Sequence, residues 1–224
     1  MKNLKPIQIL FEDEYLLIVN KPAGIPSQPT VDPKRPSVYT LLQKQFPQLT
    51  LFLHHRLDKD TTGVYLLSKS SKANKPLTDM FREHKFQKTY LSINKKNLEW
   101  TQREWKVTNH LAPVKNGKKQ LMRMVVVNKG GWYAETDFKI IKELKNSNLI
   151  LLESKPLTGR THQIRVHSAL NKMPILGDFL YGGKSELSSQ ILLHAQKLEF
   201  NHPITRVPLI IESPLSEYII NTFL

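Results

Sequence analysis

Cysteine is absent from the 224-residue sequence. This absence excludes disulfide bonds, thiolate nucleophiles and cysteine-ligated zinc together. No apolar run approaches the roughly 20 residues that a membrane-spanning helix needs, and the N-terminal stretch MKNLKPIQILFEDE lacks the long apolar core of a signal peptide. We therefore expect a cytoplasmic protein whose chemistry depends on oxygen and nitrogen groups or on a borrowed cofactor.

Motifs that bind nucleotide cofactors or metals are missing as well. The sequence contains no GxGxxG after its first expected strand and no GxxxxGK[ST] anywhere, which argues against NAD and ATP. The eight histidines form no HExxH pair and accompany no compact carboxylate cluster, so they are not arranged as a typical metal site. We therefore expect no phosphate-cradling loop for ATP or NAD and no histidine metal site.

Acidic residues are few relative to basic ones. The chain has 33 lysine and arginine residues against 19 acidic residues, a net charge of +14. Residues 54–123 hold 16 of the basic residues and only six acidic ones. A solvated surface explains any single lysine, but the group favours a polyanionic partner. RNA or DNA is the first candidate, ahead of an anionic membrane.

Short strands and a few helices follow one another in mixed order. Residues 104–155 contain strand-like runs separated by turn residues, which indicates an antiparallel meander. This order favours an α+β fold around one large, mostly antiparallel sheet, in a single domain of two lobes over residues 1–224. Helical spacing of apolar residues, with serines suited to cap the second helix, predicts helices over 36–47, 70–86, 160–172 and 213–224.

The polar loop HHRLDKDTTG, residues 54–63, lies between two apolar runs and carries two carboxylates. Loops at strand ends commonly present reactive side chains. Asp58 and Asp60 fit an acid/base pair of the glycosidase kind, but carboxylates two residues apart in a loop often cap a turn instead. Asp60 suits the turn, which leaves Asp58 as the candidate for chemistry.

The stretch HRLDKDTTG resembles the active-site motif of the RluA-type pseudouridine synthases. Three further stretches agree with this family in order and approximate spacing, namely FEDEYLLIVNKPAGIPSQP, KTYL and LTGRTHQIRVHSALNKMPILGDFLYGG, the last followed by LLHAQKLEFNHP. The resemblance covers almost the whole chain, and TGRTHQIRVH is long enough to be highly specific. It implies the pseudouridine synthase fold, with helices flanking the sheet and a central active-site cleft.

The resemblance also implies a reaction and the residues that perform it. Uracil is detached from C1′ of a uridine in rRNA or tRNA, rotated and reattached through carbon, without cofactor or metal. Asp58 matches the essential carboxylate, which either attacks C1′ or removes a proton from C2′. Arg165 matches the arginine that pairs with this carboxylate and keeps it ionised.

Two more residues match family positions that handle the base. Tyr90 matches the tyrosine that stacks on the target base and is a candidate for proton transfer at C5. Arg56 matches the arginine that enters the RNA stack when the nucleotide is flipped out. Without the resemblance, Tyr90 also fits ordinary strand packing, and Arg165 a helix surface.

Supporting and RNA-binding residues complete the expectation. Lys21, Thr62, Gly63 and Leu193 are supporting candidates, and Lys21 fits a purely structural role in its turn equally well. The S4-like RNA-binding domain of many relatives is not expected, so the catalytic domain itself must bind phosphates. The expected phosphate surface comprises Lys59, Lys72, Lys75, Arg82, Lys85, Lys88, Lys118, Lys119 and Arg123.

Rival functions stay open beside this interpretation, in which the protein is a monomer. A ribonucleoside hydrolase would use the same carboxylate but release free uracil. A non-catalytic RNA-binding protein would explain the charge and leave uridine unchanged. Thr62 and Ser168 depart from the residues frequent in the family, which concerns local packing more than catalysis.

Overall fold

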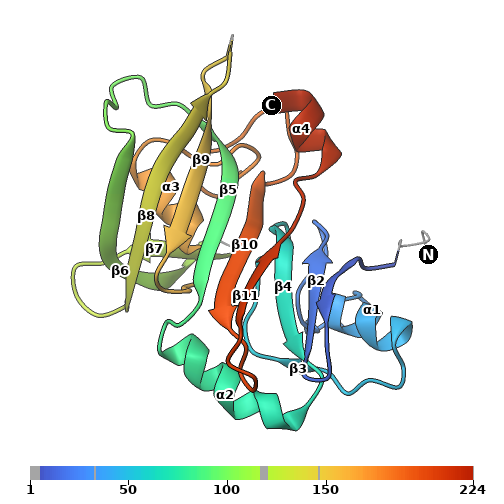
Figure 1. Cartoon of the computed structure of the whole chain (residues 1–224). Coiled ribbons are helices and arrows are strands. Elements are labelled where there is room, and N and C mark those ends of the chain that lie inside the picture. Colours follow the sequence, from blue (N-terminus) through green and yellow to red (C-terminus); the bar gives the residue numbers. More distant parts are fainter. Residues whose placement is uncertain (1–5, 33, 117–120, 146, 224) are drawn as a thin grey trace. The chain divides into compact units, whose positions relative to one another are not determined.

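The computed structural model describes residues 6–32, 34–116, 121–145 and 147–223, and Figure 1 traces the chain. The chain divides into two compact units. Unit 1 comprises Met1–Gln87 and Ala195–Leu215, and unit 2 comprises Lys88–His194 and Ser216–Leu224. Each unit is therefore assembled from two stretches that are distant in the sequence.

Unit 1 is built on a sheet in which β1, β2, β4 and β10 are neighbours in that order, while β3 pairs with β4 and β11 with β10 (Figure 1). The pairs whose register is described, β1 with β2, β2 with β4, β3 with β4 and β10 with β11, all run antiparallel. Strand β10 begins with two residues of unit 2. The elements are β1 (Ile9–Glu12), β2 (Leu16–Lys21), β3 (Phe52–Leu53), β4 (Thr62–Ser68), β10 (Leu193–Asn201), β11 (Pro208–Glu212), α1 (Val38–Gln45) and α2 (Ser71–Arg82).

Both helices of unit 1 begin at a serine cap. The backbone N–H of Thr40 donates to Ser37 Oγ over 3.1 Å, and the N–H of Ser37 donates to Thr40 Oγ1 over 2.9 Å. This reciprocal pair satisfies two N–H groups that have no partner within the helix. Ser70 caps α2 by accepting from the N–H of Lys72. The serine cap predicted for the second helix is confirmed, and α1 lies within the range predicted for the first.

The core of unit 1 lies between α2 and the sheet. Ala73, Leu77 and Met80 recur at helical spacing, so they lie on one face of α2 and are buried. They belong to one hydrophobic cluster with residues of β2 and β4 such as Leu16 and Leu66. This packing fixes α2 on the sheet strands β2 and β4, and the polar loop enters β4 at the other end, at Thr62.

Unit 2 contains the antiparallel meander that the sequence predicts. Its strands are neighbours in the order β5, β9, β8, β6 and β7, and each pair is antiparallel (Figure 1). Helix α3 packs against β7, β8 and β9. The elements are β5 (Gln87–Lys95), β6 (Glu104–Asn116), β7 (Leu121–Val126), β8 (Trp132–Glu143), β9 (Leu149–Pro156), α3 (Gln163–Leu170) and α4 (Glu217–Phe223).

The predicted α+β class with a mostly antiparallel sheet is confirmed, and two local predictions differ from the structure. Helix α3 begins at Gln163 rather than at 160, because Gln163 Oε1 accepts from Thr158 Oγ1 (2.6 Å) and from the N–H of Arg160 (3.0 Å) and orders that segment as a turn. Strands β10 and β11 were not predicted. A single domain over 1–224 stays a prediction. No helix within the described ranges is long and apolar enough to cross a membrane.

Candidate active site

Asp58 lies in a tight turn between β3 and β4 in unit 1. The backbone N–H of Thr61 donates to the carbonyl of Asp58 over 3.2 Å and closes the turn. Asp60 lies inside this turn, with its carboxylate 4.0 Å from Lys59 Nζ. Asp58 is half-buried, whereas Arg56, two residues earlier, is exposed. The loop thus presents a partly shielded carboxylate close in sequence to a solvent-facing cation.

Lys21, the last residue of β2, is completely buried beneath this turn. Its Nζ donates to three backbone carbonyls, those of Pro22 (3.0 Å), Lys59 (2.8 Å) and Thr61 (2.8 Å). An ammonium has three N–H donors, so these contacts use all of them. Burial lowers the pKa of Lys21 to about 8, against the opposing effect of Asp60 and Asp58. Lys21 therefore ties the end of β2 to both sides of the turn.

Two further contacts hold the loop at its ends. Ser27 Oγ donates to the carbonyl of Leu57 over 2.8 Å and accepts from the N–H of the same residue over 3.0 Å. Gly63 lies opposite Lys21 in the β2–β4 register and has φ +105°. A Cβ on Gly63 would lie 2.2 Å from the carbonyl oxygen of Ala195. Ser27 lies within the stretch FEDEYLLIVNKPAGIPSQP but was not among the predicted site residues, and its partner is 30 residues away.

Tyr90 and Leu193 lie in one hydrophobic cluster of unit 2. Tyr90 is on β5, opposite Ser154 of β9, and is half-buried against the cluster that contains Leu193 and Ile164. Ile164 is in the first turn of α3, next to Arg165 in the chain. Three of the sequence-predicted regions, the tyrosine strand, Leu193 and the start of α3, are thereby brought together within unit 2.

Arg165 is buried on α3 and forms an ion pair that the sequence did not predict. Its Nε donates to Asp178 Oδ2 over 2.7 Å, and its Nη2 donates to Asp178 Oδ1 over 2.9 Å. The helix-surface interpretation of Arg165 is therefore wrong, because only 7% of the residue is exposed. Asp58 belongs to unit 1 and Arg165 to unit 2, and the pairing of the two stays a prediction.

Polar residues of the motif TGRTHQIRVH anchor α3 to the sheet of unit 2. Gln163 Nε2 donates to Thr136 Oγ1 over 2.9 Å, and His167 Nδ1 lies 2.9 Å from the same hydroxyl. The other ring nitrogen of His167 is 3.2 Å from Asn109 Oδ1. Burial lowers the pKa of His167 to about 4, so its imidazole is neutral at pH 7. These side chains position the helix that carries Arg165.

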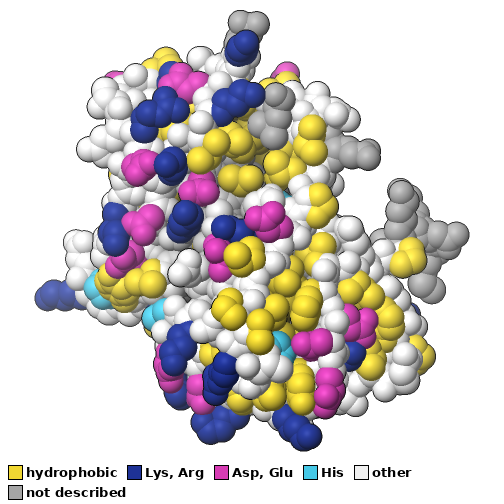
Figure 2. Space-filling view, viewed as in Figure 1, with side chains coloured by type: hydrophobic (Ala, Val, Ile, Leu, Met, Phe, Trp, Pro, Cys, Tyr) yellow, Lys and Arg dark blue, Asp and Glu magenta, His cyan; other side chains and the backbone are white. Residues whose placement is uncertain are grey.

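Three of the nine residues of the predicted phosphate surface lie on α2, where Figure 2 shows basic side chains. Lys72 is exposed. Lys75 and Arg82 both contact Asp79, at 2.6 and 2.7 Å, on the helix surface. Lys85, just beyond the helix, contacts Glu83 at 2.7 Å. These exposed pairs cost little to separate, because surface ion pairs are weak, and so the cations remain accessible to phosphates.

Other members of the predicted surface differ from this pattern. Lys88 is half-buried in unit 2, and its Nζ donates to the carbonyl of Thr158 over 3.2 Å. Burial, with the nearby charge of Arg160 as a second cause, lowers the pKa of Lys88 to about 8. Lys118 and Lys119 lie outside the described residues.

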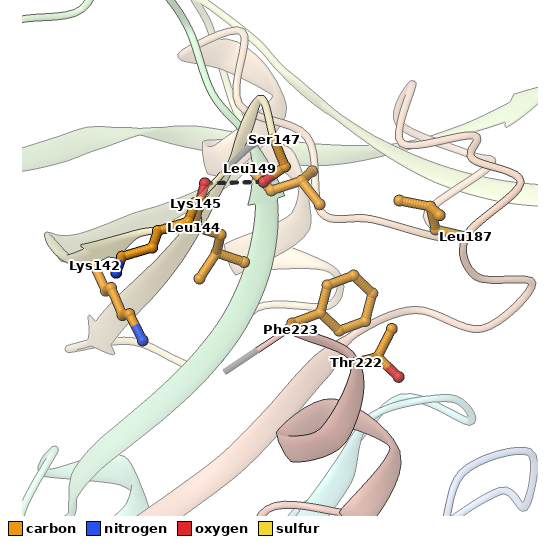
Figure 3. A pocket seen from close by; sticks show the side chains of 8 residues that line it. All are labelled: Lys142, Leu144, Lys145, Ser147, Leu149, Leu187, Thr222 and Phe223. Atoms are coloured by element: carbon orange, nitrogen blue, oxygen red, sulfur yellow. Dashed lines mark hydrogen bonds between the residues drawn. The ribbon is translucent and has the colours of Figure 1, made fainter.

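A pocket of about 360 Å³ opens in unit 2 beside α4 (Figure 3). Ser147 Oγ donates to the carbonyl of Leu144 over 3.0 Å at its rim. Among the residues that the structure describes, none of the sequence-predicted site residues lines this pocket. Its lining combines Leu144, Leu149, Leu187 and Phe223 with Lys142, Lys145, Ser147 and Thr222.

Known proteins match this chain along most of its length. A family model described as RNA pseudouridylate synthase matches residues 15–170. Ribosomal large subunit pseudouridine synthase C of Vibrio vulnificus is 32% identical over 216 residues, which cover 93% of this chain and 66% of that protein. An uncharacterized RNA pseudouridine synthase of Bacillus subtilis is 36% identical over 212 residues, which cover 93% of this chain and 68% of the relative. The chain therefore spans about two thirds of the length of these relatives.

Solved structures agree in fold. Human RNA Pseudouridylate Synthase Domain Containing 1 matches with a TM-score of 0.76 at 22% identity. The match covers 96% of this chain and 86% of the human chain. Human RNA Pseudouridylate Synthase Domain Containing 4 has a TM-score of 0.73 at 23% identity, covering 95% of this chain and 90% of that one. These two likenesses establish the pseudouridine synthase fold. The family match includes the Asp58 turn, Tyr90 and Arg165, and so the chain belongs to the RNA pseudouridylate synthase family.

Proposed function

We propose that the protein is an RNA pseudouridine synthase, an isomerase that converts uridine in RNA to pseudouridine without a cofactor. The observation that carries this proposal is the construction of the Asp58 turn. A buried ammonium directs all three donors to backbone carbonyls around this turn, and burying a cation is unfavourable. Such a strongly held short loop is expected where a side chain must be placed accurately for a reaction.

Asp58 acts on the ribose in this proposal, either by attacking C1′ or by removing the C2′ proton. Both routes need an ionised carboxylate. A positive charge within about 4–6 Å favours the ionised form, and Arg165 supplies it if the predicted pairing forms. Deuterium at C2′ separates the two routes, because only proton removal breaks that bond and slows the reaction with a primary isotope effect.

Two other residues are proposed to act on the target base and on the RNA stack from which it is flipped out. Tyr90 stacks on the uracil and is the candidate for moving the C5 proton, since its half-buried position on β5 leaves part of the ring accessible. Arg56 takes the place of the flipped nucleotide, and its exposure on the loop supports this role. Unstacking a base costs a few kcal/mol, which such a side chain helps to offset.

The first substrate to test is large-subunit rRNA. The Vibrio vulnificus relative is named as a ribosomal large subunit pseudouridine synthase, and tRNA is the second candidate. The exposed cations on α2 supply contacts to phosphates, in keeping with the net charge of +14. We further propose that the protein acts as a cytoplasmic monomer.

The test measures pseudouridine and free uracil after incubation of the protein with rRNA and tRNA transcripts. We expect pseudouridine with the wild type, none with Asp58→Asn, and activity within a few-fold of wild type with the matched control Asp60→Asn. Undiminished activity of Asp58→Asn contradicts the assignment of Asp58. Free uracil indicates a hydrolase, and RNA binding with unchanged uridine indicates a binding protein.

A further inference from the structure

We propose that Asp178 is a positioning residue for catalysis, which holds the guanidinium of Arg165 in one orientation with Tyr181 as a second support. This inference rests on the proposed function, because it concerns how Arg165 is presented to the reacting carboxylate. The residues that carry it all lie in unit 2.

The contact between Arg165 and Asp178 is a two-point fork. Nε and Nη2 of Arg165 donate to the two carboxylate oxygens of Asp178 at 2.7 and 2.9 Å. Asp178 is completely buried and Arg165 nearly so. Two parallel hydrogen bonds fix the plane of a guanidinium as well as its position, which a single contact does not do. Asp178 therefore determines both where the cation lies and which way it faces.

Asp178 is itself held by a compact loop. Its backbone carbonyl accepts from the N–H groups of Gly183 (2.7 Å) and Tyr181 (3.2 Å). Gly177 has φ +81°, and a Cβ on Gly183 would lie 1.8 Å from the carbonyl oxygen of Ile175. Only glycine fits these two positions, so the loop around Asp178 has little freedom to adjust.

Tyr181 supports the same guanidinium from another side. The central carbon of the Arg165 guanidinium lies 5.1 Å from the centre of the Tyr181 ring, within the range of a cation–π interaction. The Tyr181 hydroxyl accepts from the N–H of Met124 over 2.8 Å and lies 2.9 Å from His162 Nδ1. The ring is thus fixed at its far end to β7 and to the residue that precedes α3.

A local turn-forming role alone does not account for Asp178. Its Oδ1 also accepts from the N–H of Leu180 over 3.2 Å, which is a common turn contact. A turn needs only one such contact, and an exposed carboxylate can make this contact just as well as a buried one. Burying a charge pair costs free energy that well-packed apolar residues avoid. The buried pair is better explained by the geometry that it imposes on Arg165.

The orientation of the fork suits a second carboxylate. Contact through Nε and Nη2 occupies one edge of the guanidinium, and the edge formed by Nη1 and Nη2 is directed elsewhere. The pairing of Arg165 with Asp58, which stays a prediction, would use this edge. A guanidinium that tilts when Asp178 is removed still carries its charge but no longer presents this edge correctly.

The experiment is a double-mutant cycle on pseudouridine formation. Asp178→Asn removes the charged two-point contact. Arg165→Lys keeps a positive charge but cannot make a two-point contact with Asp178. We expect Asp178→Asn to lower kcat by about 10- to 100-fold in the wild-type background, with KM for RNA nearly unchanged. In the Arg165→Lys background the same substitution is expected to lower kcat by less than about twofold.

Controls separate positioning from loss of fold. Asp137→Asn removes an exposed carboxylate of the same unit and is expected to leave kcat unchanged. Tyr181→Phe keeps the ring and is expected to reduce kcat less than Tyr181→Leu, which removes it. All variants are assayed at a temperature at which circular dichroism shows them folded, and Asp178→Glu replaces Asp178→Asn if the latter does not fold.

Two results overturn the inference. One is an Asp178→Asn enzyme with wild-type kcat, and the other is an equal loss of kcat in both backgrounds, which means that Asp178 acts independently of Arg165. Failure of the proposed function is distinguishable, because the wild type then forms no pseudouridine or Asp58→Asn remains active.

Discussion

Lys21 in unit 1 and Arg165 in unit 2 are both buried cations, but they are held by different partners. Lys21 contacts three backbone carbonyls, and Arg165 contacts both oxygens of one carboxylate. An ammonium is a compact charge that suits carbonyls converging from several directions, whereas a planar guanidinium matches the two oxygens of a carboxylate. Lys21 therefore determines the path of a loop, and Arg165 is given a defined orientation.

The difference also teaches which substitutions each region tolerates. Backbone carbonyls are present whatever the side chain, so the loop around Lys21 depends little on the identity of residues 59 and 61. The Arg165 fork depends on a single residue, Asp178. Stability should accordingly depend on the identity of residue 178 more than on the identity of residues 59 and 61. The loss caused by a substitution at Arg165 should be partly recovered by a second substitution at Asp178.

The largest expected effect on stability comes from breaking the fork. Arg165→Met leaves Asp178 buried without its charged partner, and we expect the free energy of unfolding to fall by about 4 kcal/mol. The double variant Arg165→Met/Asp178→Leu should recover much of that loss, because apolar packing replaces an ion pair without leaving a charge buried. Urea unfolding of the three proteins measures both values. A double variant no more stable than Arg165→Met would show that the fork is not the cause.

The backbone opposite Lys21 is expected to be nearly as sensitive. Gly63→Ala places a methyl group against the carbonyl of Ala195 and strains a positive φ, so we expect a loss of about 3 kcal/mol. Gly24→Ala is the matched control, since Gly24 has φ +80° but an added Cβ there would have no atom within 4 Å, and it should cost about 1 kcal/mol. Equal losses in thermal or urea unfolding would exclude the steric contact as the reason.

Removal of the Lys21 charge tests how much its hydrogen bonds to three backbone carbonyls stabilise the protein. Lys21→Met fills similar space but leaves the carbonyls of residues 22, 59 and 61 without the donor, and we expect a loss of about 2 kcal/mol together with reduced pseudouridine formation. The exposed Lys72→Met should change stability by less than about 0.5 kcal/mol. Full activity of Lys21→Met would show that the hydrogen bonds of Lys21 are not needed to place Asp58.

Acid should weaken the helix that carries Arg165 by a smaller amount. His167 has a pKa of about 4 in the folded protein against an ordinary value of 6.5, because burial disfavours its charged form. The unfolded chain therefore binds the extra proton between these values, and stability is lost as the pH falls from 6.5 towards 4. We expect His167 to contribute a loss of about 1 kcal/mol at pH 5.5 relative to pH 7.5.

Urea unfolding at several pH values measures this contribution. A His167→Gln variant should show a flatter dependence between pH 7.5 and 5.5, whereas the exposed His110→Gln should follow the wild type. A wild-type slope that persists in His167→Gln would assign the acid sensitivity to other groups.

Local sequence patterns were sufficient for much of the fold. Ser70 could be identified as a helix start because the cap and its partner lie within two residues, and β8 and β9 were predictable as strand-like runs bounded by turn residues. The start of α3 was misplaced because Gln163 orders the preceding turn through side-chain contacts that alternation does not report. Lys88 looked like a surface cation, and only its position beside Thr158 shows that it is half-buried.

The sequence by itself determined the family, the excess of positive charge, the α+β class and the loop on which Asp58 lies. The tertiary structure decided the partners: Lys21 meets carbonyls up to 40 residues away, Arg165 meets Asp178 within unit 2, and Gly63 lies against Ala195. The physical reason is one of range. Periodicity and capping act between neighbours in the chain, whereas the partner of a buried charge is chosen by the packing that brings distant segments together.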